Sequence, residues 1–214
     1  GFGQADAGVI LVGHACCAKN RSEQFGDFSG VTVEIERDMR IGKFHPFDVR
    51  QRILITGIGG TGIITIGALL AMAAHLEGKA ASVLDQTGLA QKGGAVLSHV
   101  RIGRTPELLH AVRLAACSAD VILAGDLVVS ASREGLNYTN PLRTHAVINT
   151  HETIVADFTR NPNSKVPSPA LLERLAKRCK PAGVSTVEAN RLATALFGDS
   201  IAANLFLLGY AYQK

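Results

Sequence analysis

The sequence predicts an α/β fold in which helices cover both faces of a mostly parallel sheet, and three observations predict it. First, a short apolar run at residues 53–56 leads into four glycines and then into an apolar helical pattern at residues 63–76. Second, short apolar runs alternate with helical patterns over the rest of the chain. Third, 47% of the 214 residues are hydrophobic and only 19% are charged, which is enough for a sizeable core. Together these features are typical of a Rossmann-like three-layer fold.

The first quarter of the chain differs from the rest. Residues 1–51 show no sustained hydrophobic period, and we expect an irregular N-terminal extension or a junction with a neighbouring module. Residues 52–214 are expected to form the main domain. Because the chain begins at Gly1 rather than Met, we expect a piece of a longer protein, or a processed or cloned start.

The turn after the first strand is the first candidate cofactor site. Glycine permits positive φ and close backbone approach, and the N-terminus of the following helix offers free N–H groups and a partial positive charge. This is the phosphate-loop geometry of dinucleotide-binding βαβ units. The candidate cofactor-binding residues of this turn are Gly57, Gly59, Gly60, Thr61 and Gly62.

The helix after this turn should end near Gly78, a helix-terminating glycine, and Gly67 within it should be a packing notch against a strand. A second strand at residues 80–84, parallel to the first in a right-handed βαβ unit, should end at Asp85, which lies 23 residues after Gly62. Dinucleotide-binding folds place an acid on a ribose hydroxyl at about this spacing. Since Asp85 runs directly into a polar loop, capping of that loop is its alternative role.

The loop at residues 86–95 is polar and glycine-rich, and it follows the carboxyl end of a strand. Loops at this edge of an α/β sheet face the ligand, so we expect further cofactor contacts there. For Lys92, a phosphate contact and a solvated surface position remain equally open. The candidate cofactor-binding residues of this loop are Gln91, Lys92, Gly93 and Gly94.

The remaining chain continues the layered alternation. Asp126 and Asn149 each follow or close a buried strand, which places them at the same edge as the glycine turn. His99 is better interpreted as a satisfied structural histidine than as a ligand. The long loop at residues 151–168 should be functional or partner-bound.

Apolar runs predict strands at residues 96–102, 121–124, 146–150 and 184–187, and helical patterns predict helices at residues 127–135, 169–180, 191–197 and 201–212. The last of these is apolar nearly all round, so it should be buried or covered by a partner.

Composition excludes several function classes. The formal charge of +4 is spread along the chain, so we expect no nucleic-acid partner. No apolar run has transmembrane length, so we expect no membrane partner, and cysteines expected to be reduced thiols favour a cytoplasmic location. The scattered histidines show no metal spacing and no residue shows a nucleophile–base arrangement, so no catalytic and no metal-binding residue is expected in this chain. The cysteines form no C-x-x-C pair and should be reduced thiols that hold no iron–sulfur cluster: Cys16, Cys17, Cys117 and Cys179.

Four motifs carry a resemblance to a known family. They are Gly57-x-Gly59-Gly60-x-Gly62, the loop Gly88-Leu89-Ala90-Gln91-Lys92-Gly93-Gly94 with Ser98-His99-Val100-Arg101, the turn Asn149-Thr150-His151-Glu152, and Gly198-Asp199-Ser200-x-x-x-Asn204. From about residue 52 to 214 the chain resembles the gamma-type domain of 2-oxoacid:ferredoxin oxidoreductases, the pyruvate/ketoisovalerate oxidoreductase catalytic domain. It is most similar to the fused indolepyruvate ferredoxin oxidoreductases. Related subunits often carry Gln where this chain has Thr61.

The resemblance implies an enzyme that oxidatively decarboxylates an aryl 2-oxoacid to an acyl-CoA and passes the electrons to ferredoxin. Thiamine diphosphate, [4Fe-4S] clusters and CoA are implied for the complete enzyme, with the thiamine and cluster ligands in other modules. The implied partners are those modules, ferredoxin, the 2-oxoacid and CoA. This chain would dock on the thiamine domains, help to hold CoA near the entrance of the active site, and be inactive on its own.

Two alternatives to this function remain open at the level of sequence. The first is a free-standing NAD(P)-binding Rossmann protein that uses Gly57, Gly59, Gly62 and Asp85 in the usual way. The second is a scaffold whose glycine turn binds nothing and only allows close helix–sheet packing. Beyond the predicted sheet the sequence shows no clear substrate domain with an acid–base pair, which disfavours the NAD(P)-binding alternative.

Overall fold

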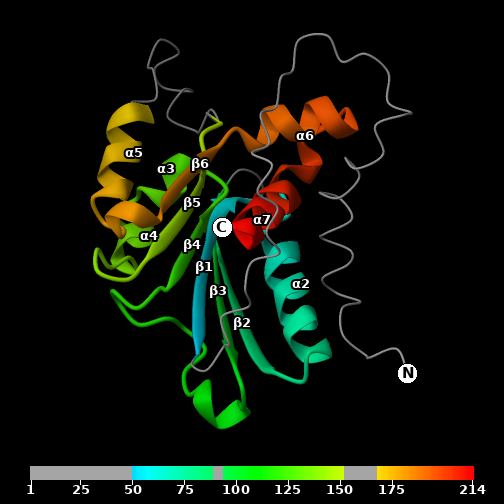
Figure 1. Cartoon of the computed structure of the whole chain (residues 1–214), viewed down its shortest axis with the longest axis vertical. Helices are drawn as coiled ribbons and strands as arrows, with labels where there is room; N and C mark the ends of the chain where they lie inside the picture. Colours follow the sequence, from blue (N-terminus) through cyan, green and yellow to red (C-terminus); the bar gives the residue numbers. More distant parts are fainter. Residues whose placement is uncertain (1–49, 89–93, 152–167) are drawn as a thin grey trace.

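A computed structural model describes residues 50–88, 94–151 and 168–214 as a six-stranded sheet with helices on both faces (Figure 1). This confirms the expected three-layer α/β class. The strand order across the sheet is β2-β3-β1-β4-β5-β6. The strands are β1 (Gln51–Ile58), β2 (Ala80–Thr87), β3 (Ala95–Gly103), β4 (Val121–Ala124), β5 (His145–Asn149) and β6 (Val184–Val187).

The helices divide between the two faces of the sheet. One layer contains α2 (Ile63–Leu76), α6 (Ala189–Phe197) and α7 (Ala203–Gln213), which Figure 1 shows in a row along one side. The other layer contains α3 (Leu127–Ser130), α4 (Arg133–Asn137) and α5 (Ser168–Ala176). Short 3₁₀ turns occur at Pro106–Leu108, Pro181–Gly183 and Ser200–Ala202.

Strand β3 runs against the direction of the others. It pairs antiparallel with both β1 and β2, whereas β1–β4, β4–β5 and β5–β6 are parallel pairs. In the expected β1-α2-β2 unit the two strands therefore run parallel to each other. They are not neighbours in the sheet, because β3 lies between them. The sheet is mostly parallel, as predicted, with one antiparallel strand inserted at the second position.

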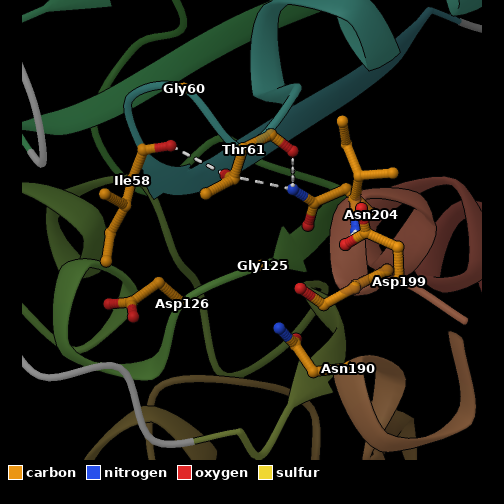
Figure 2. Close-up of a pocket in the computed structure, with 11 residues that line it drawn as sticks. Ile58, Gly60, Thr61, Gly125, Asp126, Asn190, Asp199 and Asn204 are labelled. Carbon is orange, nitrogen blue, oxygen red and sulfur yellow. Dashed lines mark hydrogen bonds between the residues drawn. The ribbon is translucent and has the colours of Figure 1, made fainter. Parts of the chain in front are cut away.

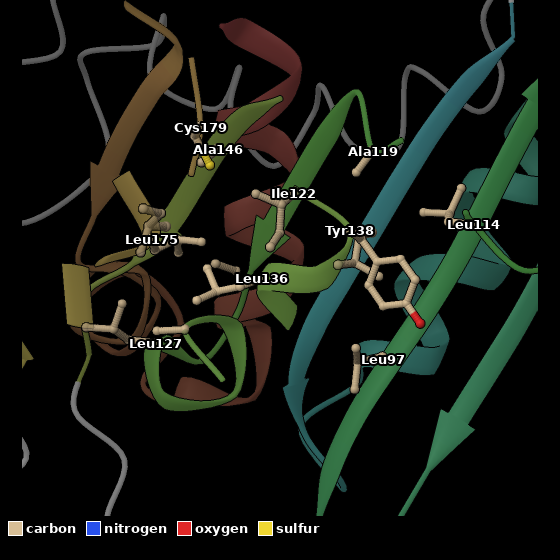
Figure 3. Close-up of a cluster of buried hydrophobic side chains, with 14 residues drawn as sticks. Leu97, Leu114, Ala119, Ile122, Leu127, Leu136, Tyr138, Ala146, Leu175 and Cys179 are labelled. Carbon is tan, nitrogen blue, oxygen red and sulfur yellow. The ribbon is translucent and has the colours of Figure 1, made fainter. Parts of the chain in front are cut away.

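Successive residues of the central strands fill two separate cores, because side chains alternate between the faces of a strand. Leu54, Ile122 and Ile148 pack under α3, α4 and α5, in the cluster drawn in Figure 3. Ile55 and Leu123 point to the other face, where they pack against α2, α6 and α7. Burial of each such side chain contributes about 1.5–3 kcal/mol.

Some boundaries differ from those expected. Strand β2 continues to Thr87, so Asp85 lies inside the strand and not at its end. The predicted helix at residues 127–135 is two short helices, because Ser132 has an extended backbone and its side chain caps α4 by accepting from Gly135 N at 3.1 Å. The predicted helix at 169–180 ends at Ala176, four residues early, and its last residues form the turn that precedes Pro181.

Helix α2 matches its predicted bounds. It ends where Gly78 takes the left-handed conformation, with φ 71°, and donates its N–H to His75 O. Gly67 is the expected packing notch: a Cβ added there would lie 2.8 Å from Ser98 Oγ and 3.3 Å from Val83 Cγ1. Glycine at this position therefore allows α2 to lie directly on β2 and β3.

We predict that Gly67→Val destabilises the protein by about 2 kcal/mol, because the added methyl groups force α2 away from the sheet. The matched control is Ala68→Val, which places the same side chain on the exposed side of the same helix. Urea denaturation followed by circular dichroism would measure both. Equal losses for the two variants would show that helix propensity, and not the notch, is the cause.

Candidate functional site

A cavity of about 260 Å³ opens at the carboxyl ends of β1 and β4 (Figure 2). The chain leaves β1 toward β2 on one side of the sheet, whereas it leaves β4 toward β5 on the other. The cavity therefore lies at the topological switch point, where α/β sheets bind their ligands. We call it the switch-point pocket. Its lining residues are Ile58, Gly60, Thr61, Gly125, Asp126, Asn190, Asp199, Ser200, Ile201, Ala203 and Asn204.

A buried asparagine ties the glycine turn to the last helix. Asn204 Nδ2 donates to the carbonyl oxygen of Thr61 at 2.5 Å and to its Oγ1 at 3.1 Å. Thr61 Oγ1 in turn donates to Ile58 O at 2.7 Å. Figure 2 shows these bonds side by side on the wall of the pocket. The hydroxyl of Thr61 is thus engaged in holding the turn, and the side chain has little capacity left for a ligand.

A second asparagine, Asn149 at the end of β5, holds the neighbouring part of the edge. Its Nδ2 donates to Gly125 O at 3.1 Å and to Asn190 Oδ1 at 2.7 Å. Its Oδ1 accepts from the backbone N–H groups of Ala189 at 3.1 Å and His151 at 3.3 Å. Asn149 therefore uses both ends of its amide to join the ends of β4 and β5 to the start of α6, and it positions Asn190 at the pocket.

Two carboxylates give the switch-point pocket its charge. Asp126 Oδ1 accepts from Val129 N at 2.9 Å and caps α3, and Asp199 Oδ1 accepts from Ile201 N at 3.0 Å. In the described part of the chain no Lys, Arg or His lines this pocket. Its present lining therefore favours a ligand that donates hydrogen bonds over a diphosphate, despite the glycine turn.

The glycine turn itself divides into residues that line the pocket and residues that pack. Gly60, like Thr61, lines the pocket. Gly57 is a packing position, since an added Cβ would lie 2.5 Å from Ile63 Cδ1. Gly59 N donates to Gly94 O at 2.8 Å, which brings the two predicted cofactor segments together. Gly62 has φ 86° and caps α2. The predicted contacts Gln91, Lys92 and Gly93 lie outside the described residues.

Asp85 is not where the sequence places it. It lies within β2, which β3 separates from β1, and it does not line the switch-point pocket. Its partner in register is Ser98 on β3. This position does not fit the predicted role of holding a ribose beside the glycine turn. Most of the loop that Asp85 was alternatively predicted to cap lies outside the described residues.

A second and larger cavity, of about 700 Å³, lies near α4 at the carboxyl end of β2. We call it the α4 cavity. Arg113 and Arg133 line it together with the carboxylate of Glu134. The full lining is Gln86, Thr87, Gly88, Ala95, Leu97, Arg113, Arg133, Glu134, Asn137 and Tyr138.

His99 supports the floor of the α4 cavity. The ring is fully buried, its Nε2 lies 2.9 Å from Gln86 Oε1, and its centroid lies 4.8 Å from that of Tyr138 in an edge-on arrangement. The pKa of His99 is lowered to about 4, first by burial and then by the charge of Arg113, against an opposing effect of Asp85. The sequence predicted a structural histidine with its hydrogen bonds satisfied, and this is correct for Nε2. The other ring nitrogen, Nδ1, has no hydrogen-bond partner among the described residues.

Sequence reasoning found part of this arrangement. It placed Asp126 and Asn149 at the correct edge, and Asp199 and Asn204 appeared only within the motifs of the resemblance. It did not single out Asn190 as a pocket residue, and Ser200 likewise appeared only within the C-terminal motif of the resemblance. A sequence feature that could have identified the missed pocket residues is a polar residue directly after a strand or just before a helix, because its side chain reaches the carboxyl edge of the sheet.

Three further observations concern the described residues only. Cys117 and Cys179 are not joined to other cysteines. No cluster of three or more His, Cys, Asp or Glu side chains suitable for a metal ion occurs within the described ranges. None of the helices in these ranges combines the length and the hydropathy that spanning a bilayer requires.

The sequence comparisons with known proteins identify one family. The family model described as pyruvate ferredoxin/flavodoxin oxidoreductase matches residues 52–214. Indolepyruvate oxidoreductase subunit IorB of Thermococcus kodakarensis is 35% identical over 99 residues, which cover 46% of this chain and 45% of that protein. IorB of Archaeoglobus fulgidus is 32% identical over 113 residues, or 52% of each chain. The match thus spans about half the length of these curated relatives.

Among solved structures, pyruvate oxidoreductase subunit PORC of Thermotoga maritima resembles this chain with a TM-score of 0.52 and 18% identity. The similarity covers 74% of this chain and 73% of that one. At this identity the likeness shows a shared fold.

We predict that the protein loses about 2 kcal/mol of stability through His99 between pH 7 and pH 5. The unfolded histidine has an ordinary pKa near 6.5, and the folded one has a pKa of about 4, so acidification protonates the unfolded state first and favours unfolding. Urea denaturation at both pH values would measure this. His99→Phe should show a smaller loss, because it lacks the buried ring whose pKa differs between the folded and unfolded states. Identical pH dependence in the two proteins would contradict the prediction.

Proposed function

We propose, from the premise that the chain belongs to the pyruvate ferredoxin/flavodoxin oxidoreductase family, that it is one module of a thiamine-dependent 2-oxoacid:ferredoxin oxidoreductase. The complete enzyme would convert a 2-oxoacid anion and the CoA thiol to an acyl-CoA, carbon dioxide and a proton, and two ferredoxins would each take up one of the two electrons released. The substrate we propose is an aryl pyruvate such as indolepyruvate, because the matched relatives are indolepyruvate oxidoreductase subunits.

One observation carries this proposal: segments from all four family motifs lie at the carboxyl edge of the sheet, and hydrogen bonds link three of them directly. Gly59 bonds to Gly94, which joins the glycine turn to the end of the second motif's loop. Asn204 bonds to Thr61, which joins the same turn to the C-terminal motif. Asn149 of the remaining motif bonds to Gly125 beside the switch-point pocket. A shared edge built from these segments supports a common contact surface for substrate or partner.

We assign the thiamine diphosphate and the [4Fe-4S] clusters to neighbouring modules. Thiamine diphosphate supplies the decarboxylation chemistry when it is bound there. Cys179 fits a cluster poorly, since burial raises its pKa to about 11 and so disfavours the thiolate that iron requires. The part proposed for this chain is to dock on the thiamine module and to hold CoA with the loop at residues 86–95.

An apolar surface supports the proposed docking. Exposed large hydrophobic side chains gather on the layer of α2, α6 and α7, which lie along one side of the sheet in Figure 1. Elsewhere in the described residues only Val112 and Leu142 are large, apolar and exposed. Exposed apolar residues concentrated in this way mark an interaction surface. The residues are Ile64, Leu69, Met72, Leu76, Leu196, Phe197, Ile201, Leu205 and Tyr212.

The docking face predicts which substitutions weaken assembly. The double variant Met72→Glu and Leu205→Glu should reduce co-purification of the chain with its thiamine-binding partner module about tenfold, since both carboxylates would have to be desolvated at the interface. The control is Leu142→Glu, an 88% exposed position in the turn between α4 and β5, which should assemble normally. Normal assembly of the double variant would place the contact on another face.

The central test is activity of the complete enzyme. Indolepyruvate- and CoA-dependent reduction of ferredoxin should be present in the complete enzyme and absent both from this chain alone and from an enzyme that lacks residues 52–214. Within the complete enzyme, Lys92→Ala should raise the apparent KM for CoA several-fold, because it removes a cation from the loop at the proposed CoA contact. Lys177→Ala, at a 72% exposed side chain on the helical surface, is the control.

Two results would contradict the proposal. An unchanged KM for CoA in Lys92→Ala would remove the proposed CoA contact. A saturable rise in the melting temperature of the isolated chain with NADH or NADPH would favour the free-standing NAD(P)-binding alternative. The structure gives that alternative less support than the sequence does, because Asp85 lies away from the switch-point pocket.

A further inference from the structure

The α4 cavity has a different chemical character from the switch-point pocket. It lies near α4 at the carboxyl end of β2. Its lining includes two arginines and one glutamate, so positive charges outnumber negative ones. Its volume of about 700 Å³ is within the range of sites for drug-sized ligands. Amide groups of Gln86 and Asn137 add hydrogen-bond donors, and Leu97 with the ring of Tyr138 adds an apolar wall.

The hydroxyl of Tyr138 holds Arg113 in place. Its Nε and Nη2 donate to the hydroxyl oxygen of Tyr138 at 3.0 and 2.6 Å, and its guanidinium carbon lies 5.8 Å from the centre of the same ring. Tyr138 is only 3% exposed, so it is a rigid support. No ion pair joins Arg113 to a carboxylate among the described residues. A fixed guanidinium that is not neutralised and that faces a cavity is preorganised for an anion.

His99 orients a second donor toward the same ligand. Gln86 Oε1 can only accept, so the Nε2–H of the neutral His99 ring donates to it across 2.9 Å. The amide nitrogen of Gln86 is then left with both of its hydrogens for the cavity that Gln86 lines. Because His99 is fully buried beneath, this orientation does not depend on solvent.

We propose that the α4 cavity binds the phosphate groups of a nucleotide ligand through Arg113, Arg133 and Gln86. Two guanidinium charges and two amides match the charge and the several acceptor oxygens of a phosphate dianion or diphosphate better than the two oxygens of a carboxylate. The cavity exceeds the size of inorganic phosphate, and its apolar wall accommodates an attached organic group. Gly88 and Ala95 line it, so it adjoins the loop to which the proposed function assigns CoA.

The inference rests on the proposed function only for the source of the phosphates, which is CoA or an adenine nucleotide. Isothermal titration of the full 214-residue chain would separate the sources with four probes: CoA, ADP, pyrophosphate and pantetheine, which has no phosphate. Saturable binding of CoA, ADP or pyrophosphate, with none of pantetheine, is expected. Stronger binding of CoA than of ADP assigns the site to CoA, and equal binding assigns it to adenosine phosphates.

Substitutions test the residues. Arg113→Met keeps the apolar stem and should weaken binding of the phosphate-bearing probe at least tenfold, and Arg133→Met should weaken it a few-fold. Tyr138→Phe keeps the buried ring and removes the hydroxyl that holds Arg113, so it should also weaken binding a few-fold with an unchanged circular dichroism spectrum. Arg191→Met, which lies on α6 in the opposite layer, is the matched control and should bind as the wild type does.

Absence of saturable binding by every phosphate-bearing probe would overturn the inference, and so would wild-type affinity in Arg113→Met. These results are separable from the test of the proposed function. If the complete enzyme oxidises no 2-oxoacid, the proposed function is overturned, but phosphate binding at Arg113 can still be observed. If the enzyme is active and the isolated chain binds no phosphate-bearing probe, the inference about the α4 cavity is overturned and the proposed function stands.

Discussion

The antiparallel pairing of β3 with β1 is the constraint from which the arrangement of the carboxyl edge follows. All eight residues of β1 pair with β3, from Gln51 opposite Ile102 to Ile58 opposite Ala95. This register brings the start of β3 to the end of β1, where Gly59 bonds to Gly94. The same insertion moves β2 to the edge of the sheet, and with it Asp85. One strand pairing thus joins the two glycine segments and removes the acid that a dinucleotide site would use.

The two cavities differ in charge because different elements close them. The switch-point pocket is completed by helix-capping carboxylates, Asp126 and Asp199, together with asparagines from the last two helices. The α4 cavity is completed by arginines from the segment before β4 and from α4. Helix-capping acids belong near helix N-termini, where the backbone N–H groups favour negative charge. The chain therefore separates an acidic site from a basic one, and the apolar face of α2, α6 and α7 meets the acidic site at Ile201.

Local elements could be predicted well where the signal is local. Helix α2 and the strands at residues 121–124 and 184–187 have the expected bounds, because a hydrophobic period or a short apolar run between turn residues is sufficient there. Residues Gln86 and Thr87 are polar and suggested a loop, but pairing with β3 keeps them in strand β2. The helix expected at residues 127–135 is split because Ser132 caps a new helix, and serine within an apolar stretch gives little warning of this.

The sequence by itself determined the layered α/β class, the strand–glycine–helix unit and the polar residues that close the strands, because these depend on neighbours a few positions apart. Only the tertiary structure decided that β3 enters between β1 and β2, that Asp85 leaves the site, and that Asn204 bonds to Thr61, 143 residues away. Strand order and such long-range hydrogen bonds depend on where the chain returns in space. Hydrophobic periodicity and turn chemistry describe the conformation of a segment, and they carry no information on which distant segment will lie beside it.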